Sequence, residues 1–170
     1  MLVNLGCGDR YAATWQNVDH AGSPHRKDVT VDLLADNLPW PTGSILHIYM
    51  GHVLEHLPYD GCLDLLKRLL PLVKPEGQIM VVGPDCQVAQ LMAEAGTLEV
   101  TLDSLKYGAD RWAGDRHEWE CTAEKVTALL EGAGWTDIHD VGINHVAAFW
   151  PVADRRPQWQ CAIAARSPQR

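Results

Sequence analysis

The sequence predicts a single α/β domain over residues 1–170, with a mainly parallel sheet and an antiparallel strand added at its C-terminal end. Three observations support this fold class. Short apolar segments typical of strands alternate with segments of helical periodicity. The length of 170 residues fits one domain, because roughly 70% of the unfolded surface can be buried at this size. Apolar residues make up 46% of the chain, without any low-complexity segment.

The predicted strands are, in chain order, residues 2–5, 15–19, 28–34, 45–50, 79–82, 138–143 and 160–165. The first is a buried apolar run that stops at Gly6-Cys7-Gly8, and the third alternates apolar and polar residues for most of its length. Two prolines and a glycine predict a loop over residues 38–44. The stretch between the last two strands is expected to form a loop or a loose hairpin.

Helices are predicted over residues 59–73, 87–95, 98–107 and 122–132. In the first, Leu63, Leu66 and Leu70 recur at helical spacing, and Pro71 should kink or end it. A turn is expected directly after this helix, at Lys-Pro-Glu-Gly. Thr122 is a suitable N-terminal cap for the last helix.

Charge and cysteine usage exclude several classes of protein. The net charge of −8 repels phosphate backbones and anionic lipid, so neither nucleic acid nor a membrane is expected as a partner. Apolar runs are far shorter than the ~20 residues that cross a bilayer. The start, MLVNLGCGDR, shows no export signal, which predicts a cytoplasmic location. Five scattered cysteines without a C-x-x-C pair predict reduced thiols.

A glycine turn and an aspartate follow the first two strands. Gly6 and Gly8 allow close approach of a ligand to the backbone, although such a turn often has no ligand. Tyr11 stands where a dinucleotide fingerprint needs a third glycine, and Asp19 comes too early for its acid, so a nicotinamide cofactor is not expected. A carboxylate at the position of Asp19 can accept hydrogen bonds from a ribose diol, or it can simply be solvated.

Five blocks follow one another along the chain: NLGCG, WQNVDH, VDLLADNLPWPTGSI, IYMGHVLEHL and LKRLLPLVKPEGQIMVVGPD. Their order and spacing resemble the class I S-adenosylmethionine-dependent methyltransferases, above all the short members of that family. The resemblance covers residues 2–85 and continues more weakly through HEWECTAEKVTALLEGAGW. It implies a Rossmann-like methyltransferase fold in three layers, S-adenosyl-L-methionine as cofactor, and methyl transfer to a small or soluble acceptor.

The same resemblance implies a cofactor site at the ends of the first four strands. Residues 6–8 would lie under the methionine part and the ribose, residues 19–20 would hold the ribose hydroxyls, residues 32–33 would lie near the adenine, and residues 50–52 beside the sulfonium. The implied cofactor-binding residues are Gly6, Cys7, Gly8, Asp19, His20, Asp32, Leu33, Met50, Gly51 and His52. Without the family, the apolar members are interpreted as core and the exposed polar ones as solvated loop residues.

The candidate catalytic residues are His52, Asp85 and His117, each able to take a proton from an acceptor. Aromatic and basic side chains crowd the segment around the last of them and predict an acceptor pocket; the alternative is a surface loop pinned by buried tryptophans. The residues of this segment are Tyr107, Arg111, Trp112, Arg116, His117, Glu118 and Trp119. A weaker second pocket candidate consists of Trp150, Arg155, Arg156 and Trp159.

Two other hypotheses remain open. The chain begins at the first strand and residues 9–16 are too few for a crossover helix, so the pocket is expected to be open, or covered by residues 97–121 or by a partner subunit in a homo-oligomer. This favours a non-catalytic binding or assembly subunit as the second hypothesis. The third is a zinc hydrolase, in which His52 and His56 on a helix bind zinc and Glu55 is the base, although Pro58 would end that helix. No metal is expected in the methyltransferase hypothesis.

Overall fold

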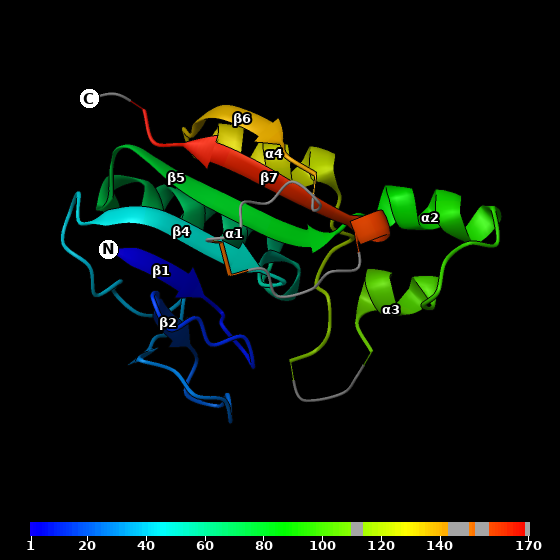
Figure 1. Cartoon of the computed structure of the whole chain (residues 1–170), viewed down its shortest axis with the longest axis horizontal. Coiled ribbons are helices and arrows are strands. Elements are labelled where there is room, and N and C mark those ends of the chain that lie inside the picture. The colour runs from blue at the N-terminus through cyan, green and yellow to red at the C-terminus, as the bar shows by residue number, and fades with distance from the viewer. Residues whose placement is uncertain (110–113, 143–149, 152–156, 169–170) are drawn as a thin grey trace.

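The computed structural model describes residues 1–109, 114–142, 150–151 and 157–168. Within these residues seven strands form one sheet in the order β3-β2-β1-β4-β5-β7-β6 (Figure 1). The strands are β1 (Leu2–Leu5), β2 (Gln16–Asp19), β3 (Val29–Thr30), β4 (Ile45–Gly51), β5 (Val73–Pro84), β6 (Thr136–Asp140) and β7 (Gln160–Arg166). Strands β1 to β5 pair in parallel, and β7 is antiparallel to both β5 and β6. The predicted sheet is confirmed.

The central strands are buried on both faces. On one face, Val3 and Leu5 of β1 and Ile48 and Met50 of β4 have no exposed surface. Asn4 and Tyr49, which alternate with them, are 2% and 1% exposed on the other face. In register, Leu5 lies beside Met50, so β1 and β4 end side by side. Near-continuous apolar runs are typical of parallel strands that are covered on both sides. The loops that follow β1 and β4 therefore begin next to each other, at the same edge of the sheet.

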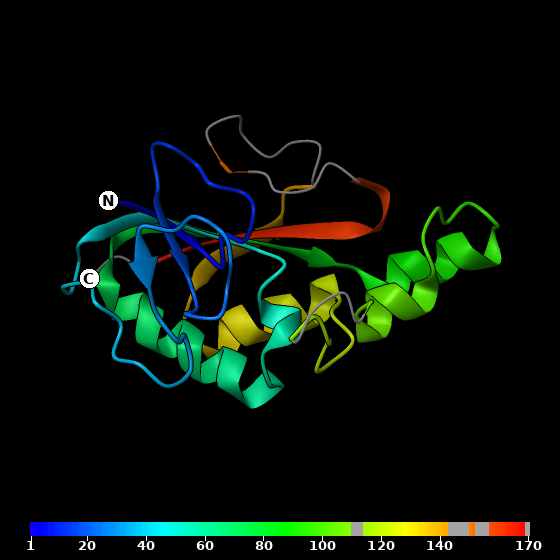
Figure 2. The ribbon, with the colours of Figure 1, turned by 90° about the horizontal axis from the view of Figure 1, so that it is seen from below.

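Two helices cover one face of the sheet, α1 (Tyr59–Leu69) and α4 (Ala123–Gly132) (Figure 2). Their apolar sides join the main core, and the indole of Trp135 donates a hydrogen bond to the carbonyl oxygen of Leu66 at 3.3 Å. The helices α2 (Cys86–Glu94) and α3 (Leu102–Tyr107) lie beyond the carboxyl end of β5 (Figure 1). They therefore stand next to the edge where the first strands deliver their loops.

The opposite face is covered differently. Among the described residues no α-helix lies there, and an aromatic cluster takes its place, in which Trp15 packs against Trp150 with ring centroids 5.4 Å apart. The blue loop that leads to β2 lies on this side in Figure 2. The residues between β1 and β2 are too few for a crossover helix. Within the described residues, the third layer of the predicted sandwich therefore consists of loops.

Several predicted boundaries were wrong. The helix expected over residues 98–107 begins at Leu102, and the strand expected over 138–143 is β6, which ends at Asp140. Three further differences have a visible local cause. The strand expected over residues 28–34 is only β3, because the Asp32 carboxylate accepts N–H bonds from Leu34 and Ala35 and closes a turn. The helix expected over 59–73 is α1, which already ends at Leu69, and a 3₁₀ turn containing Pro71 follows it. The expected Lys-Pro-Glu-Gly turn instead forms the exposed start of the long strand β5.

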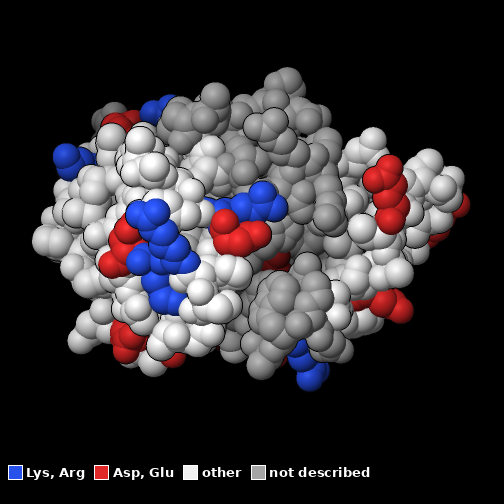
Figure 3. Space-filling view, turned by 60° about the horizontal axis from the view of Figure 1, so that its bottom comes forward, with Lys and Arg blue, Asp and Glu red and all other residues white. Residues whose placement is uncertain are grey.

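Surface charge is mixed on the face drawn in Figure 3. Basic side chains form several groups there, and acidic side chains border the largest of them. The described residues on this face therefore form no continuous basic stripe of the kind that follows a phosphate backbone. Within the described part of the chain, none of the helices combines the length and the apolar character needed to cross a bilayer.

Candidate active site

The loop after β1 leaves open space over its backbone at Gly8. Gly6 and Gly8 both adopt left-handed backbone conformations, with φ of +63° and +50°. A Cβ atom at Gly6 would lie 2.4 Å from Cγ2 of Val53, so the chain is tightly packed on that side. A Cβ atom at Gly8 would meet no atom within 4 Å. A ligand can therefore approach the main chain at Gly8, where a side chain would fill the space.

Asp19 ends β2 beside this glycine turn. Its Oδ2 accepts a hydrogen bond from the Gly8 N–H at 3.0 Å and its Oδ1 one from the His20 N–H at 2.8 Å. The residue is 9% exposed, whereas the His20 ring is largely exposed, with Nε2 3.9 Å from Asp19 Oδ1. Each carboxylate oxygen can accept a further bond. The Asp19 carboxylate is thus fixed in place, and its two oxygens can still accept hydrogen bonds from two hydroxyl groups.

Cys7 lies between the two glycines, and its thiol is not set up as a nucleophile. Its N–H bonds to the Val18 carbonyl at 3.0 Å and its side chain is buried. Burial, and next the nearby Asp19 carboxylate, raise the pKa of this thiol to about 11. The thiol form therefore predominates at neutral pH.

Asp32 and Leu33 follow β3, at the same edge of the sheet. The Asp32 carboxylate caps its own turn, and the N–H groups of Leu34 and Ala35 lower its pKa despite some desolvation. The positive charge that His20 can acquire also lowers the pKa of Asp32, so the ends of β2 and β3 are close together. Leu33 is half-buried against the core.

The end of β4 bends sharply at Gly51 and His52. Met50 is fully buried, and a Cβ atom at Gly51 would lie 2.8 Å from the Tyr49 ring. His52 has φ of +56°, which is uncommon for a residue with a side chain, and its N–H bonds to the Val82 carbonyl at 2.8 Å. Such a conformation is retained where the surroundings hold it, often at functional sites.

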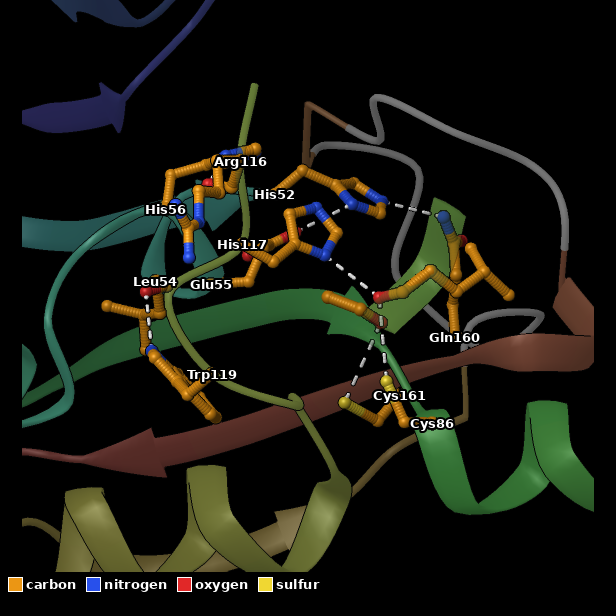
Figure 4. Close-up of polar contacts among 12 residues, drawn as sticks. His52, Leu54, Glu55, His56, Cys86, Arg116, His117, Trp119, Gln160 and Cys161 are labelled. Carbon is orange, nitrogen blue, oxygen red and sulfur yellow. Dashed lines mark hydrogen bonds and ion pairs between the residues drawn. The ribbon is translucent and has the colours of Figure 1, made fainter. Parts of the chain in front are cut away.

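The His52 ring bridges two buried side chains from distant parts of the sequence. Its Nδ1 lies 3.0 Å from Oε1 of Glu55, and its Nε2 lies 2.7 Å from the amide nitrogen of Gln160 (Figure 4). The tautomer protonated at Nδ1 satisfies both contacts, since it donates to the carboxylate and accepts from the amide. The ring is 27% exposed and Glu55 is 1% exposed.

Glu55 is a buried carboxylate with basic neighbours. Burial alone raises its pKa, but the hydrogen bond from His52 and the proximity of His52, His56 and His117 outweigh that effect and lower the pKa overall. Figure 4 shows the three imidazoles gathered around it. The carboxylate is therefore ionised at neutral pH and can stabilise a positive charge on a neighbouring ring.

The other two candidate proton acceptors differ in their surroundings. Asp85 is buried and caps α2, where its Oδ1 accepts N–H bonds from Gln87 and Val88 at 3.1 and 3.3 Å. His117 lies on the segment that crosses in front of η1 (Leu54–His56), with Nδ1 2.8 Å from the Leu105 carbonyl. Burial lowers the pKa of His117, which favours the neutral ring.

A hollow of about 480 Å³ lies where the acceptor pocket was expected. Its lining residues are Lys106, Tyr107, Arg116, His117, Glu118, Trp119 and Glu120. The Trp119 indole N–H donates hydrogen bonds to the carbonyl oxygens of Leu54 and Leu57 and so holds this segment against η1. Of the predicted set, Arg111 and Trp112 lie outside the described residues.

The second acceptor candidate is not assembled in the described part of the chain. Trp150 packs in the aromatic cluster on the second face of the sheet, whereas Trp159 packs in a separate cluster with α2 and α3. Arg155 and Arg156 lie outside the described residues. The two tryptophans therefore do not line a common pocket.

The geometry of the zinc-hydrolase hypothesis is not found in the described chain. His52 precedes the three-residue 3₁₀ helix η1 in a left-handed conformation, so it does not share an α-helical face with His56. Its ring bonds to Glu55, the residue that this hypothesis needs as a free base. The α-helix that this hypothesis requires is therefore absent from the described residues.

No protein-family model matches this sequence, and a search of curated proteins finds no match. Solved structures do match. A SAM-dependent methyltransferase from Methanosarcina mazei superposes with a TM-score of 0.63 at 10% identity, over 99% of this chain and 92% of that one. The strand order and this superposition indicate the same fold. The chain has the class I methyltransferase fold.

Two further matching structures contain bound ligands. Human N-acetylserotonin methyltransferase in complex with SAM gives a TM-score of 0.62 at 18% identity, over 99% of this chain and 47% of that one. The Burkholderia thailandensis 1,6-didemethyltoxoflavin-N1-methyltransferase, with bound 1,6-didemethyltoxoflavin and S-adenosylhomocysteine, gives a TM-score of 0.57 at 14% identity, over 99% of this chain and 71% of that one. The chain spans about half the length of some matched structures, including 50% of the methyltransferase SibL.

Sequence analysis did not identify Gln160, the hydrogen-bond partner of His52 Nε2. Gln160 begins β7, 108 residues later in the chain, and no local motif marks it. Glu55 was visible in the HVLEH segment, but only as part of a zinc hypothesis. Its proximity to His117 depends on the fold of the segment after α3, which periodicity does not indicate.

Proposed function

We propose that this chain is an S-adenosylmethionine-dependent methyltransferase that acts on a small or soluble acceptor. The observation that supports it best is the junction of Gly8 and Asp19. A carboxylate at the end of β2 is held by the glycine turn after β1, next to space that only a glycine leaves open. The methyltransferase fold, and its presence in structures bound to SAM or S-adenosylhomocysteine, support the same function.

The proposed cofactor contacts follow from the geometry of the strand ends. The Asp19 carboxylate accepts hydrogen bonds from the ribose hydroxyls, with the exposed His20 ring beside it. The backbone at Gly8 lies against the cofactor, and Leu33 and Asp32 border the adenine. S-adenosyl-L-methionine, when bound, supplies a methyl group activated on a sulfonium sulfur. Orientation of the acceptor is then the main task of the protein.

The proposed proton acceptor is His52. Its Nε2 takes the proton of an acceptor hydroxyl or amine as Gln160 turns aside, while the Glu55 carboxylate holds Nδ1–H and stabilises the charged ring. His117, at the wall of the 480 Å³ hollow, would help to position the acceptor. Asp85 is the less favoured candidate, because its carboxylate already caps α2.

Calorimetric titration with S-adenosylhomocysteine tests the cofactor site. Wild-type protein should bind, and Asp19→Ala should weaken binding at least about tenfold, since bonds to a charged group contribute about 1.5–3 kcal/mol each. Asp64→Ala, at an exposed position on α1, is the matched control and should bind like wild type. Absence of binding to wild-type protein at millimolar ligand would remove the basis of the proposal.

Turnover distinguishes an enzyme from a binding subunit. A panel of small hydroxyl, amine and thiol compounds is incubated with protein and cofactor, and products heavier by one methylene unit are sought by mass spectrometry. Methylation of at least one compound, lost in Asp19→Ala, supports the enzyme. Cofactor binding without any turnover supports the non-catalytic alternative instead.

A further inference from the structure

Glu55, His56 and His117 bring three metal-ligating groups together. One ligand atom from each residue lies within 4.8 Å of the other two. The rings of His56 and His117 meet edge to face with centroids 4.8 Å apart, and both stand beside the buried glutamate (Figure 4). The three residues come from η1 and from the segment after α3, which lie far apart in the sequence.

Both histidines are held in the way that metal-bound histidines usually are. Nδ1 of His56 lies 3.1 Å from the Arg116 carbonyl oxygen, and Nδ1 of His117 lies 2.8 Å from the Leu105 carbonyl oxygen. A carbonyl can only accept, so each ring carries its hydrogen at Nδ1 or is doubly protonated. In the neutral ring the Nε2 lone pair is then free, and the same second contact fixes the rings that bind metals in proteins.

The carboxylate of Glu55 has one oxygen in reserve. Its Oε1 bonds to His52, whereas its Oε2 is buried and has no hydrogen-bond partner among the described residues. Leaving a buried acceptor unpaired is costly, and the cost is greater for a charged group. An unpaired carboxylate oxygen beside two imidazoles is accounted for if a cation binds there.

The backbone around this cluster is already fixed. The Glu118 N–H bonds to the Glu55 carbonyl at 2.8 Å, and the His117 N–H bonds to the Tyr107 carbonyl at 3.1 Å. The segment with His117 therefore runs along η1 without help from an ion. A preformed arrangement of this kind reduces the ordering that binding must impose.

We propose that Glu55, His56 and His117 bind one divalent first-row transition metal ion of the Zn²⁺ type. Two imidazole nitrogens and one carboxylate oxygen suit such an ion, and three protein ligands leave a position open for water or a small ligand. Bond lengths near 2.0–2.1 Å require donor atoms about 3.3 Å apart in a tetrahedral site. The three ligand atoms, which lie within 4.8 Å of one another, would move closer together when the ion binds. The proposal does not depend on the proposed methyltransferase function.

Metal titration of the full chain without a histidine tag tests the site. Chelator-treated protein is titrated with Zn²⁺ in a calorimeter and with Co²⁺, whose visible absorption reports ligands and coordination number. We expect one ion per chain. His117→Ala and His56→Ala should each weaken binding more than about 100-fold, since loss of even an outer-shell partner costs 10–100-fold.

His139→Ala is the matched control, because His139 is exposed and its Nδ1 also lies near a carbonyl, that of Asp137 at 2.9 Å. This variant should bind the ion like wild type. Circular dichroism confirms that each variant is folded, and Glu55→Gln, which keeps the shape of the buried side chain, provides a third ligand test. Absence of 1:1 binding to wild type, or equal affinity in folded His117→Ala, would overturn the site. S-adenosylhomocysteine binding, measured separately, reports on the cofactor site alone.

Discussion

His52 and Glu55 form a hydrogen-bonded pair in which the ring stands on a left-handed backbone and the carboxylate is buried. The two atoms that meet, Nδ1 and Oε1, are 3.0 Å apart. The pair joins the end of β4 to the start of η1, next to the strand ends that form the candidate cofactor site. A buried anion behind an imidazole increases the basicity of the opposite nitrogen.

Replacing His52 should slow turnover with little effect on cofactor affinity. Asn is the suitable substitution, because it tolerates positive φ and removes the imidazole. The rate constant kcat should fall about 10²–10⁴-fold if His52 is the general base. Glu55→Gln, which keeps the ring and removes the negative charge, should give an intermediate loss. Comparison of kcat with the dissociation constant of S-adenosylhomocysteine checks this, and an unchanged kcat would contradict the assigned role.

The two glycines after β1 should respond differently to alanine. Alanine at either position costs about 1–2 kcal/mol, because its Cβ atom disfavours a left-handed backbone. Only at Gly6 does the new Cβ also overlap Val53, at 2.4 Å. Gly6→Ala should therefore lower the melting temperature more. Gly8→Ala should remain folded and lose S-adenosylhomocysteine binding, because its Cβ enters the open space. Thermal unfolding and calorimetry compare the two, and full binding by Gly8→Ala would argue against the proposed approach of the ligand.

Stability should fall as the pH drops below about 6.5. Burial, and next the N-terminal ammonium group, lower the pKa of His47 from its ordinary value of 6.5. Between the folded and unfolded pKa values the unfolded chain binds more protons, so the free energy of unfolding decreases as the pH falls through that interval. Burial acts in the same direction on His117, where nearby Glu55 opposes it and His56 and His52 reinforce it.

Melting curves of chelator-treated protein between pH 8 and 5 measure this dependence. His47→Phe keeps a ring against Trp150, whose centroid is 5.3 Å away, and should flatten the curve. His25→Asn, at an exposed position, is the control and should leave the slope unchanged. A slope in His47→Phe as steep as in wild type would show that other groups dominate.

The thiols should be unreactive in the folded protein. All five cysteines, Cys7, Cys62, Cys86, Cys121 and Cys161, are free and buried. Burial is the main reason that the pKa is raised to about 11 for Cys7, about 12 for Cys62 and about 11 for Cys86. A thiol reagent at pH 8 should modify less than one thiol per native chain, and all five after denaturation in guanidinium chloride. Rapid labelling of the native chain would contradict this burial.

The strands and the main helices could be predicted because their signals are local. Apolar runs and glycine turns located β1 and β4, and Thr122 does cap α4, accepting the Lys125 N–H at 3.2 Å. The end of β3 was missed because Asp32 bonds to backbone groups within its own turn, and such competition does not appear in a pattern of apolar residues.

The candidate site was less accessible to sequence analysis. The resemblance placed Gly8 and Asp19 at the ends of the first two strands, and in the structure the Gly8 N–H bonds to the Asp19 carboxylate. Their role in cofactor binding stays a prediction. The contact of His52 with Gln160 and the proximity of Glu55 to His117 depend on how strand β7 and the segment after α3 fold back. Such contacts between distant residues have no period and no fixed spacing, so one sequence alone does not indicate them.

Strand β7 contributes Gln160 to the surroundings of His52, and this has a consequence during protein synthesis. The ribosome delivers β1 to β5 first, yet the imidazole obtains its amide neighbour only after residue 160 has emerged from the exit tunnel. A nascent chain that has already paired its parallel strands still has an incomplete His52 environment. The surroundings of His52 are therefore complete only once translation has passed β7.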